Sequence, residues 1–399
     1  MKLMPCICTI LCATGAAASP LQTVHQIRNS VVVKNTGDIL TKLVIMLPLA
    51  QTNQYQTVSN VSVDDGTAVD IPKTDDKYLR WTLTSDLPAT GGSKEIFYTF
   101  DVTLHAINFD FSAISGWYPY DTSSSNWKWY TSASGMYVDP NNPSVQQIGD
   151  SIWSRSSDIV DYARCCYLYV AEHYSYLNPN TGIHPLQDIL DAGGGDCGNL
   201  TSIYVSLLRH KKIPSRHIVT VRPDGSYHVW SDFYLESYGW IPVDVTYKNS
   251  NPSGDYFGKY DGTGIVMTKG VALQMDRGDG FTYSAALLQT YEWWYWCSTA
   301  CNSVSSSHRI SSVTSAVYCT DRSPTNGIFK YDQMSVQNRM LDGNTRLKTT
   351  WFNLKGQAVA PRFPNGEIAP ANSVRVLPGV YVSPGVPGEN RSAKCIISR

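Results

Sequence analysis

The chain has few charged residues and no excess of either sign. Only 16% of its 399 residues are charged, and 32 Lys and Arg stand against 33 Asp and Glu, so the formal net charge is −1. Balanced charge without basic runs provides no field that would gather nucleic acid or an anionic membrane surface. We therefore expect no nucleic acid among the partners of this protein.

Long apolar segments are also missing. The run from Ile7 to Ala13 is shorter than the ~20 apolar residues that a membrane-spanning helix needs, and no later segment reaches that length, so no transmembrane segment is predicted. Lys2 precedes this run, and the small residues Ala16-Ala17-Ala18 follow it. This pattern predicts a signal peptide over residues 1–18.

The cysteines and aromatic residues favour the same compartment. Cys12 offers a lipid anchor as the alternative to cleavage, although Leu11 occupies a position where such anchors normally need a small residue. Cleavage would leave seven cysteines, and an odd count in an exported chain points either to a reactive thiol or to incomplete pairing of buried cysteines. The 25 Tyr and 11 Trp are typical of β-rich, extracytoplasmic proteins. We expect a secreted or cell-surface protein.

Short β-type runs dominate the first part of the chain. Examples are Ser30–Val33, Leu43–Met46 and Lys94–Phe100, with turn signals between them. They predict an N-terminal β-sandwich over residues 19–115.

Helical periodicity follows between Ile148 and Tyr176 and returns after the triple glycine at 193–195, where Asp196 is a suitable N-cap. Antiparallel strands come next. The order of elements predicts an α+β catalytic core over 116–320, and residues 340–399 are predicted to form a small C-terminal β-domain.

Three residues in the predicted core suggest chemistry. Cys197 opens the second helix, His228 follows 31 residues later on a strand, and Asp244 follows 16 residues after that on the next strand. A thiol attacks as its thiolate, which the partial positive charge at a helix start stabilises. If the strands bring them together, Asp244 orients the imidazole and His228 transfers the protons.

Each of these residues also has a plain structural interpretation. A cysteine after glycines is often only a small packed residue, a histidine on a strand is often hydrogen-bonded, and Asp244 alone would be explained as a turn cap. Their order and spacing favour a catalytic triad over three unrelated structural roles.

Four motifs in this region resemble the transglutaminase-like superfamily. They are Gly195-Asp196-Cys197, Ile213-Pro214-Ser215-Arg216, His228-Val229-Trp230 and Gly239-Trp240-Ile241-Pro242-Val243-Asp244. The match covers about Ile148 to Thr268 and departs at Lys212, where the family usually has a turn glycine. The resemblance implies a papain-like triad of Cys197, His228 and Asp244. It also implies acyl transfer from an amide, through a thioester, to an amine or to water.

An oxyanion formed in such a reaction needs hydrogen-bond donors. The backbone N–H of Cys197 should supply one, and a second donor is required. Tyr174 and Trp153, on the preceding helical stretch, are candidates, but packing is the favoured role for both.

A metal site is the less favoured interpretation of the later cysteines. Cys297, Cys301 and Cys319, with His308 between them, offer ligands of the kind that zinc prefers. Their spacing is irregular, however, and in an oxidising compartment one disulfide and a spare thiol are favoured. No metal and no cofactor is predicted.

The last segment carries a second resemblance, to the C-terminal sorting domains of type IX secretion cargo. The similar stretches are Asn353–Gln357, Leu377–Val382 and Lys394–Ser398. An ordinary accessory β-domain is the alternative.

Three functions therefore remain open. Hydrolysis of amide bonds by a secreted peptidase or amidase is favoured over protein cross-linking, since no clustered acids of a calcium site accompany the core. The third alternative is a surface binding protein that keeps the fold without the chemistry. The expected substrate is a protein, a peptide or a peptidoglycan peptide, and no oligomeric state is predicted.

Overall fold

The structure, a computed structural model, describes most of the chain between residues 23 and 317. The described residues are 23–37, 39–116, 118–177, 182–298 and 303–317, with the backbone of five short strands beyond residue 350. The predicted signal peptide lies outside them, as do Cys301, Cys319 and half of the residues of the sorting-like motifs. None of the described helices is long and apolar enough to cross a membrane.

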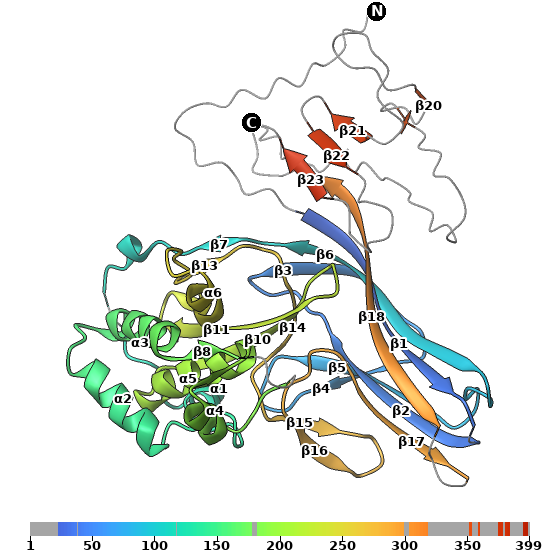
Figure 1. Cartoon of the computed structure of the whole chain (residues 1–399), viewed down its shortest axis with the longest axis horizontal. Coiled ribbons are helices and arrows are strands. Elements are labelled where there is room, and N and C mark those ends of the chain that lie inside the picture. Colours follow the sequence, from blue (N-terminus) through green and yellow to red (C-terminus); the bar gives the residue numbers. More distant parts are fainter. Residues whose placement is uncertain are drawn as a thin grey trace, which may run out of the picture.

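Two four-stranded antiparallel sheets form one half of the molecule (Figure 1). The first contains, in spatial order, β18 (Val304–Val317), β1 (Thr23–Asn35), β6 (Ser93–Leu104) and β3 (Gln56–Val63). The second contains β17 (Glu292–Cys297), β2 (Leu40–Leu49), β5 (Lys77–Leu83) and β4 (Thr67–Asp70).

The two sheets share one hydrophobic core. Buried residues alternate along β6, from Ile96 to Leu104, because successive side chains of a strand point to opposite faces. They pack in one cluster with Leu43 and Ile45 of β2 and with Trp81 of β5. Burial of such apolar surface is the main force that holds the sheets face to face.

The pairing of β17 and β18 differs from the prediction that residues 116–320 form the catalytic core. Both strands return to the N-terminal sheets, where β17 pairs with β2 and β18 pairs with β1 along its whole length. Alternation of polar and apolar residues identifies a strand, but it does not identify the partner of that strand. The two sheets are thus built from strands within residues 23–104 and from two strands within residues 292–317.

The other half of the molecule combines helices with a third antiparallel sheet (Figure 1). This sheet has the order β12 (Gly239–Val243), β11 (Tyr227–Leu235), β10 (Ser215–Val221) and β14 (Ile265–Lys269). The helices are α1 (Ser125–Tyr130), α2 (Pro143–Trp153), α3 (Ile159–His173), α4 (Leu186–Ala192), α5 (Cys197–His210) and α6 (Val245–Ser250).

Helix α5 is the centre of this half. Every residue from Gly198 to Arg209 is buried, as expected for a helix that is covered on all sides. It contacts α2, α3, α4 and α6 as well as β10 and β11. The helix is therefore fixed in place, and so is Cys197 at its first turn.

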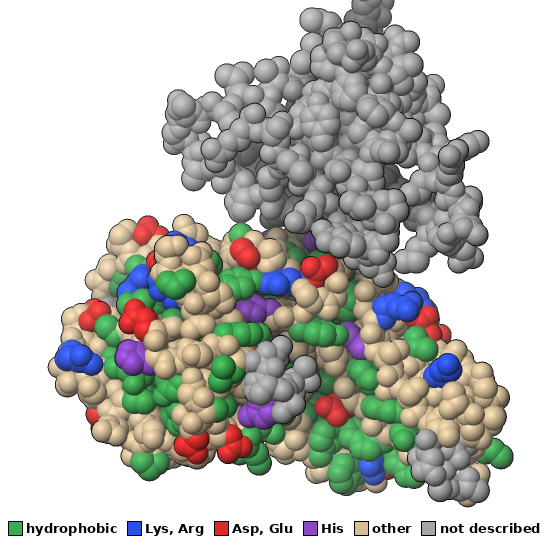
Figure 2. Space-filling view, in the orientation of Figure 1, with side chains coloured by type: hydrophobic (Ala, Val, Ile, Leu, Met, Phe, Trp, Pro, Cys, Tyr) green, Lys and Arg blue, Asp and Glu red, His purple; other side chains and the backbone are tan. Residues whose placement is uncertain are grey.

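Short elements complete the described fold. They are the 3-10 turn Phe111–Ala113, β7 (Ile107–Asn108), β8 (Ser175–Tyr176), β9 (Gly194–Gly195), β13 (Lys259–Tyr260), β15 (Leu273–Asp276), β16 (Thr282–Ala285), β19 (Trp351–Phe352), β20 (Ala358–Val359), β21 (Val374–Leu377), β22 (Val380–Ser383) and β23 (Lys394–Ile397). Strand β7, which follows the first sheets, pairs with β13 of the helical half. On the face seen in Figure 2, acidic and basic side chains are interspersed.

Candidate active site

Cys197 is presented by a sharp turn between α4 and α5. Gly193 ends α4 with φ 71°, a left-handed conformation that glycine adopts without strain. Asp196 then caps α5, accepting a hydrogen bond from the Asn199 N–H at 3.1 Å. Cys197 is the first residue of the helix, as predicted, and its side chain is half-buried.

The glycines before Cys197 are required by a close backbone contact. Strand β9 runs parallel to β8, so that Gly194 lies against Ser175. A Cβ atom at Gly194 would lie 2.0 Å from the Ser175 carbonyl oxygen. No other residue fits there without moving the backbone, which explains this part of the glycine motif.

His228 and Asp244 form a buried pair. The His228 Nε2 lies 2.6 Å from the Asp244 Oδ2, and the two residues are only 8% and 6% exposed. His228 is on β11, as predicted. Asp244, predicted on the next strand, instead follows the end of β12 and caps α6, with its Oδ1 accepting from the Tyr247 N–H at 2.8 Å. The plain interpretation of Asp244 as a cap and its predicted contact with the imidazole are therefore compatible.

Tyr247 packs against the face of the His228 imidazole ring. Its ring stacks on that of His228 with the centroids 4.7 Å apart and the planes 12° from parallel. Because the Asp244 cap begins the helix that carries Tyr247, one carboxylate fixes both the hydrogen bond and the stacking partner of His228.

The charges around His228 favour its protonated form. Burial alone would lower the pKa of His228, but the Asp244 carboxylate and the Cys197 sulfur outweigh it and raise the pKa to about 10. Since Nε2 is engaged by Asp244, Nδ1 is the ring nitrogen left for an interaction with the Cys197 sulfur, which also raises the pKa of His228. The three predicted residues thus come together in one site.

The other described cysteines have different surroundings. Cys166 is fully buried, and burial raises the pKa of its thiol far above the usual value. The pKa of Cys165 is also raised, by burial and by the nearby Asp161 carboxylate. Cys297 is disulfide-bonded, in agreement with the prediction of a disulfide in this region. His308 bonds to Tyr227 and Asn29.

Trp153, one of the two candidate oxyanion donors, takes the packing role that was favoured for it. Its ring packs edge-on against Tyr162 and lies 5.8 Å from the Lys211 ammonium. Lys211 follows the last residue of α5, a helix about 20 Å long, so Trp153 lies at the opposite end from Cys197.

Tyr174 packs instead of donating. Its ring meets that of Tyr169 and packs against the core cluster, which was the role favoured for it. Tyr176 lies close to Cys197, and it was not identified from the sequence as a neighbour of the site. It lies opposite Gly195 in the parallel β8–β9 pair, and its pKa is raised by burial and by the charges of Cys197 and Asp196. The two-residue repeat of a strand would have pointed to Tyr176 once β8 was recognised.

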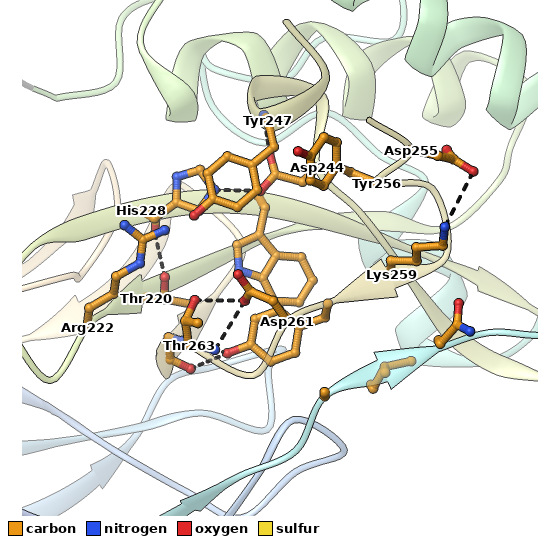
Figure 3. A pocket seen from close by; sticks show the side chains of 16 residues that line it. Thr220, Arg222, His228, Asp244, Tyr247, Asp255, Tyr256, Lys259, Asp261 and Thr263 are labelled. Carbon is orange, nitrogen blue, oxygen red and sulfur yellow. Dashed lines mark hydrogen bonds and ion pairs between the residues drawn. The ribbon is translucent and has the colours of Figure 1, made fainter. Parts of the chain in front are cut away.

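A pocket of about 610 Å³ opens beside His228 and Asp244 (Figure 3). Four aromatic side chains contribute to its wall. Arg222 and Lys259 stand at opposite ends, and Asp261 lies between them in the view of Figure 3. The lining residues used below are Arg222, Trp230, Tyr247, Tyr256, Lys259 and Tyr260. This volume is typical of sites that bind small molecules or short segments of larger ones.

Comparisons with known proteins agree with the architecture. Residues 146–245 match the family model of the transglutaminase-like superfamily, and this range contains Cys197, His228 and Asp244. A solved protein from Cytophaga hutchinsonii, provisionally assigned as a cysteine protease, is 13% identical, with a TM-score of 0.52 over 79% of this chain and 96% of that one.

The periplasmic domain of TgpA from Pseudomonas aeruginosa is 15% identical, with a TM-score of 0.29 over 59% of this chain and 90% of that one. No curated protein sequence matches the chain. The family-model match alone confirms the predicted transglutaminase-like core, over residues 146–245.

Proposed function

We propose that this chain, with its transglutaminase-like domain, is a cysteine enzyme that hydrolyses amide bonds through a thioester, with Cys197, His228 and Asp244 as its catalytic residues. The observation that carries this proposal is the His228 imidazole, bonded to Asp244 at 2.6 Å and near enough to the Cys197 sulfur for that group to help raise its pKa. A nucleophile, a base and a residue that orients the base are the parts that such chemistry needs.

The first half of the reaction forms the thioester. The Cys197 sulfur attacks the amide carbon, and the carbonyl oxygen takes the negative charge. The Cys197 N–H has no partner within its own helix and is free to donate to that oxygen. When the C–N bond breaks, the leaving nitrogen takes the proton from His228, whose raised pKa keeps it protonated until then.

The second half releases the acid. Water attacks the thioester carbon and gives one proton to His228, and the C–S bond breaks to restore the thiolate and the imidazolium. Asp244 stabilises the imidazolium throughout and holds the ring in place. The provisional assignment of the Cytophaga hutchinsonii protein as a protease favours water over an amine as the second nucleophile.

Export of the protein is part of the proposal. The disulfide at Cys297 supports it, because disulfides persist in oxidising compartments and are rare in the cytosol. Protein, peptide and peptidoglycan-peptide substrates are the classes to test.

The test is a screen of glutamine peptides and peptidoglycan stem peptides for released ammonia, cleaved peptide and incorporated amine. Wild-type protein is compared with Cys197→Ser. The proposal expects cleavage or ammonia release that the variant lacks. Equal product from both proteins would remove Cys197 from the chemistry, and amine incorporation without hydrolysis would make the enzyme a cross-linking transglutaminase.

A further inference from the structure

The pocket beside His228 lies on the side of the reaction where the leaving amine must be. His228 gives its proton to the leaving nitrogen in the proposed reaction, so the amine part of the substrate has to pass next to the imidazole. His228 and Asp244 both line the pocket. The inference below rests on the proposed function, because it assigns this pocket to the leaving part of an amide substrate.

Arg222 stands at this end of the pocket. It follows the last residue of β10, and the turn that joins β10 to β11 fixes its backbone through the bonds Arg222 N–H to Ser226 C=O and Gly225 N–H to Arg222 C=O, both 2.8 Å. Figure 3 shows its guanidinium beside the stacked rings of His228 and Tyr247. The guanidinium carbon lies 5.8 Å from the centre of the Tyr247 ring.

The guanidinium of Arg222 makes no ion pair with any carboxylate in the described part of the chain. The nearby Asp224 feels its charge, but the Asp224 oxygen accepts from the Ser226 N–H and hydroxyl at 2.9 and 2.7 Å. A guanidinium is always charged and presents paired donors that match a carboxylate. Arg222 therefore offers an unused anion-binding group within the pocket.

The second cation of the pocket does not compete. The Lys259 ammonium lies at the opposite end (Figure 3), where it is half-exposed and 3.9 Å from the Asp255 carboxylate. Asp255 is shared with Arg164, 3.5 Å away. The charges at that end compensate one another, whereas Arg222 next to His228 has no such partner among the described residues.

The wall between the two ends suits an apolar or aromatic group. Trp230 stacks on Tyr260 with centroids 4.9 Å apart and is held edge-on by Tyr55, so its position is fixed. Tyr247 and Tyr256 contribute two more rings, 5.4 Å apart. A side chain carried by the leaving part would pack against these rings.

We infer that the pocket binds the leaving amine part of the substrate and that Arg222 recognises a carboxylate on it. The substrate class is then a peptide cut close to its free carboxyl end, so that the leaving part is an amino acid or a short peptide with a terminal carboxylate. This makes Arg222 a specificity-determining residue, separate from the residues that transfer protons.

The test compares two acetylated peptide libraries that differ only in their last group, a free carboxylate or a carboxamide. Released C-terminal fragments are measured for the wild type, Cys197→Ser, Arg222→Gln and Arg222→Lys. Arg28→Gln is the matched control, since Arg28 pairs with Glu95 in the first sheet. Circular dichroism verifies that each variant is folded.

The wild type should cleave the acid library at least about tenfold faster than the amide library, the effect of one charge-assisted contact. Arg222→Gln should bring this ratio close to one, Arg222→Lys should recover part of it, and Arg28→Gln should retain it. Equal cleavage of both libraries, or a ratio that Arg222→Gln does not change, overturns the carboxylate site. Equal cleavage by wild type and Cys197→Ser overturns the proposed function instead.

Binding supplies a readout that needs no turnover. Alanyl-alanine and its amide are titrated into the Cys197→Ser protein and into the same protein with Arg222→Gln added. The inference expects the acid to bind several-fold more tightly than the amide, and expects the difference to vanish with Arg222→Gln. Equal affinities of the two probes for the single variant overturn the carboxylate site and leave the proposed function untouched.

Discussion

Strand β11 carries one member of each of two buried ion pairs, and the two pairs differ in what surrounds them. His228 pairs with Asp244 at 2.6 Å, and Asp232 pairs with Arg216 of β10 at 2.9 and 3.1 Å. All four residues are buried. Burial and charge are therefore common to both and cannot by themselves mark a catalytic site.

The Asp232–Arg216 pair is surrounded by other protein side chains. Its second oxygen also accepts from the Tyr55 hydroxyl at 2.9 Å, and the Arg216 guanidinium lies 3.7 Å from the centre of the Trp240 ring. Both Asp232 oxygens thus accept hydrogen bonds from buried protein donors. Such a cluster ties β10, β11 and the N-terminal segment together.

The His228–Asp244 pair, in contrast, borders the pocket. One nitrogen of the imidazole bonds to Asp244, and the charge of the Cys197 sulfur helps to raise the pKa of the ring. A buried pair therefore indicates chemistry when one of its side chains also faces a nucleophile and a pocket, and it indicates structure when both side chains bond only to protein groups. Substitutions in the two pairs should therefore affect different quantities.

The largest effect is expected for His228→Gln. The amide can still donate to Asp244, but it cannot move a proton, so kcat/KM on the best substrate of the screen should fall by a factor on the order of 10⁵ or more. Steady-state kinetics measure kcat/KM, and circular dichroism verifies that the variant is folded. A fall of less than tenfold in a folded variant would place His228 with the structural pair.

Asp244→Asn comes next, because it separates orientation of the imidazole from capping of α6. Asparagine also caps helices, so the fold should be kept, while turnover should fall by roughly 10⁴-fold since the amide favours the wrong imidazole tautomer.

The matched variant Asp244→Ala should lose the same activity and a further ~1 kcal/mol of stability with the cap. Urea unfolding of both proteins checks this. Similar turnover of Asp244→Asn and wild type would reduce the triad to a Cys197 and His228 dyad.

Asp232→Ala should show the opposite pattern. It leaves Arg216 buried without its partner, which should cost about 3–5 kcal/mol of folding free energy, while the kcat of the folded fraction stays within a few-fold of wild type. Replacing both members, Arg216→Met with Asp232→Leu, should recover most of the stability. A large fall in kcat with unchanged stability would show that the comparison between the pairs fails.

The smallest effect is a pH dependence that only the His228 pair should show. The pKa of His228 is raised from 6.5 to about 10, so the pair stabilises the fold fully below pH 6.5 and loses this contribution as the pH rises through 10. The stability difference between wild type and Asp244→Asn should therefore shrink between pH 7 and pH 10.5.

The cost of Asp232→Ala should remain constant over the same range, because an arginine stays protonated. Urea midpoints at the two pH values decide the matter. If the stability costs of Asp244→Asn and Asp232→Ala both fell by the same amount, the protonated state assigned to His228 would be wrong.

Much of the site follows from the sequence, since its signals are local. A glycine run, an N-cap and a cysteine specify the start of α5, and the strand that carries His228 was also expected. The Ile-Pro-Ser-Arg motif is explained by the structure as well, because its Arg216 belongs to the Asp232–Arg216 pair.

The remainder depends on contacts between distant segments. Nothing local shows that Asp244 caps α6, that Tyr247 stacks on His228 or that Arg222 faces the pocket. The return of β17 and β18 to the first sheets was missed for the same reason. Pairing and register are properties of the folded chain and leave little trace in composition or periodicity.

The central claim is that Cys197, His228 and Asp244 act as one unit, and the alkylation rate of Cys197 tests it most directly. Wild type and His228→Gln are treated with iodoacetamide at pH 7, and each cysteine is followed by peptide mapping. We predict that Cys197 of the wild type is alkylated at least about tenfold faster than Cys165 or Cys166, and that His228→Gln removes this advantage. Alkylation of Cys197 at the same rate in both proteins, or no faster than that of Cys165, would contradict the account.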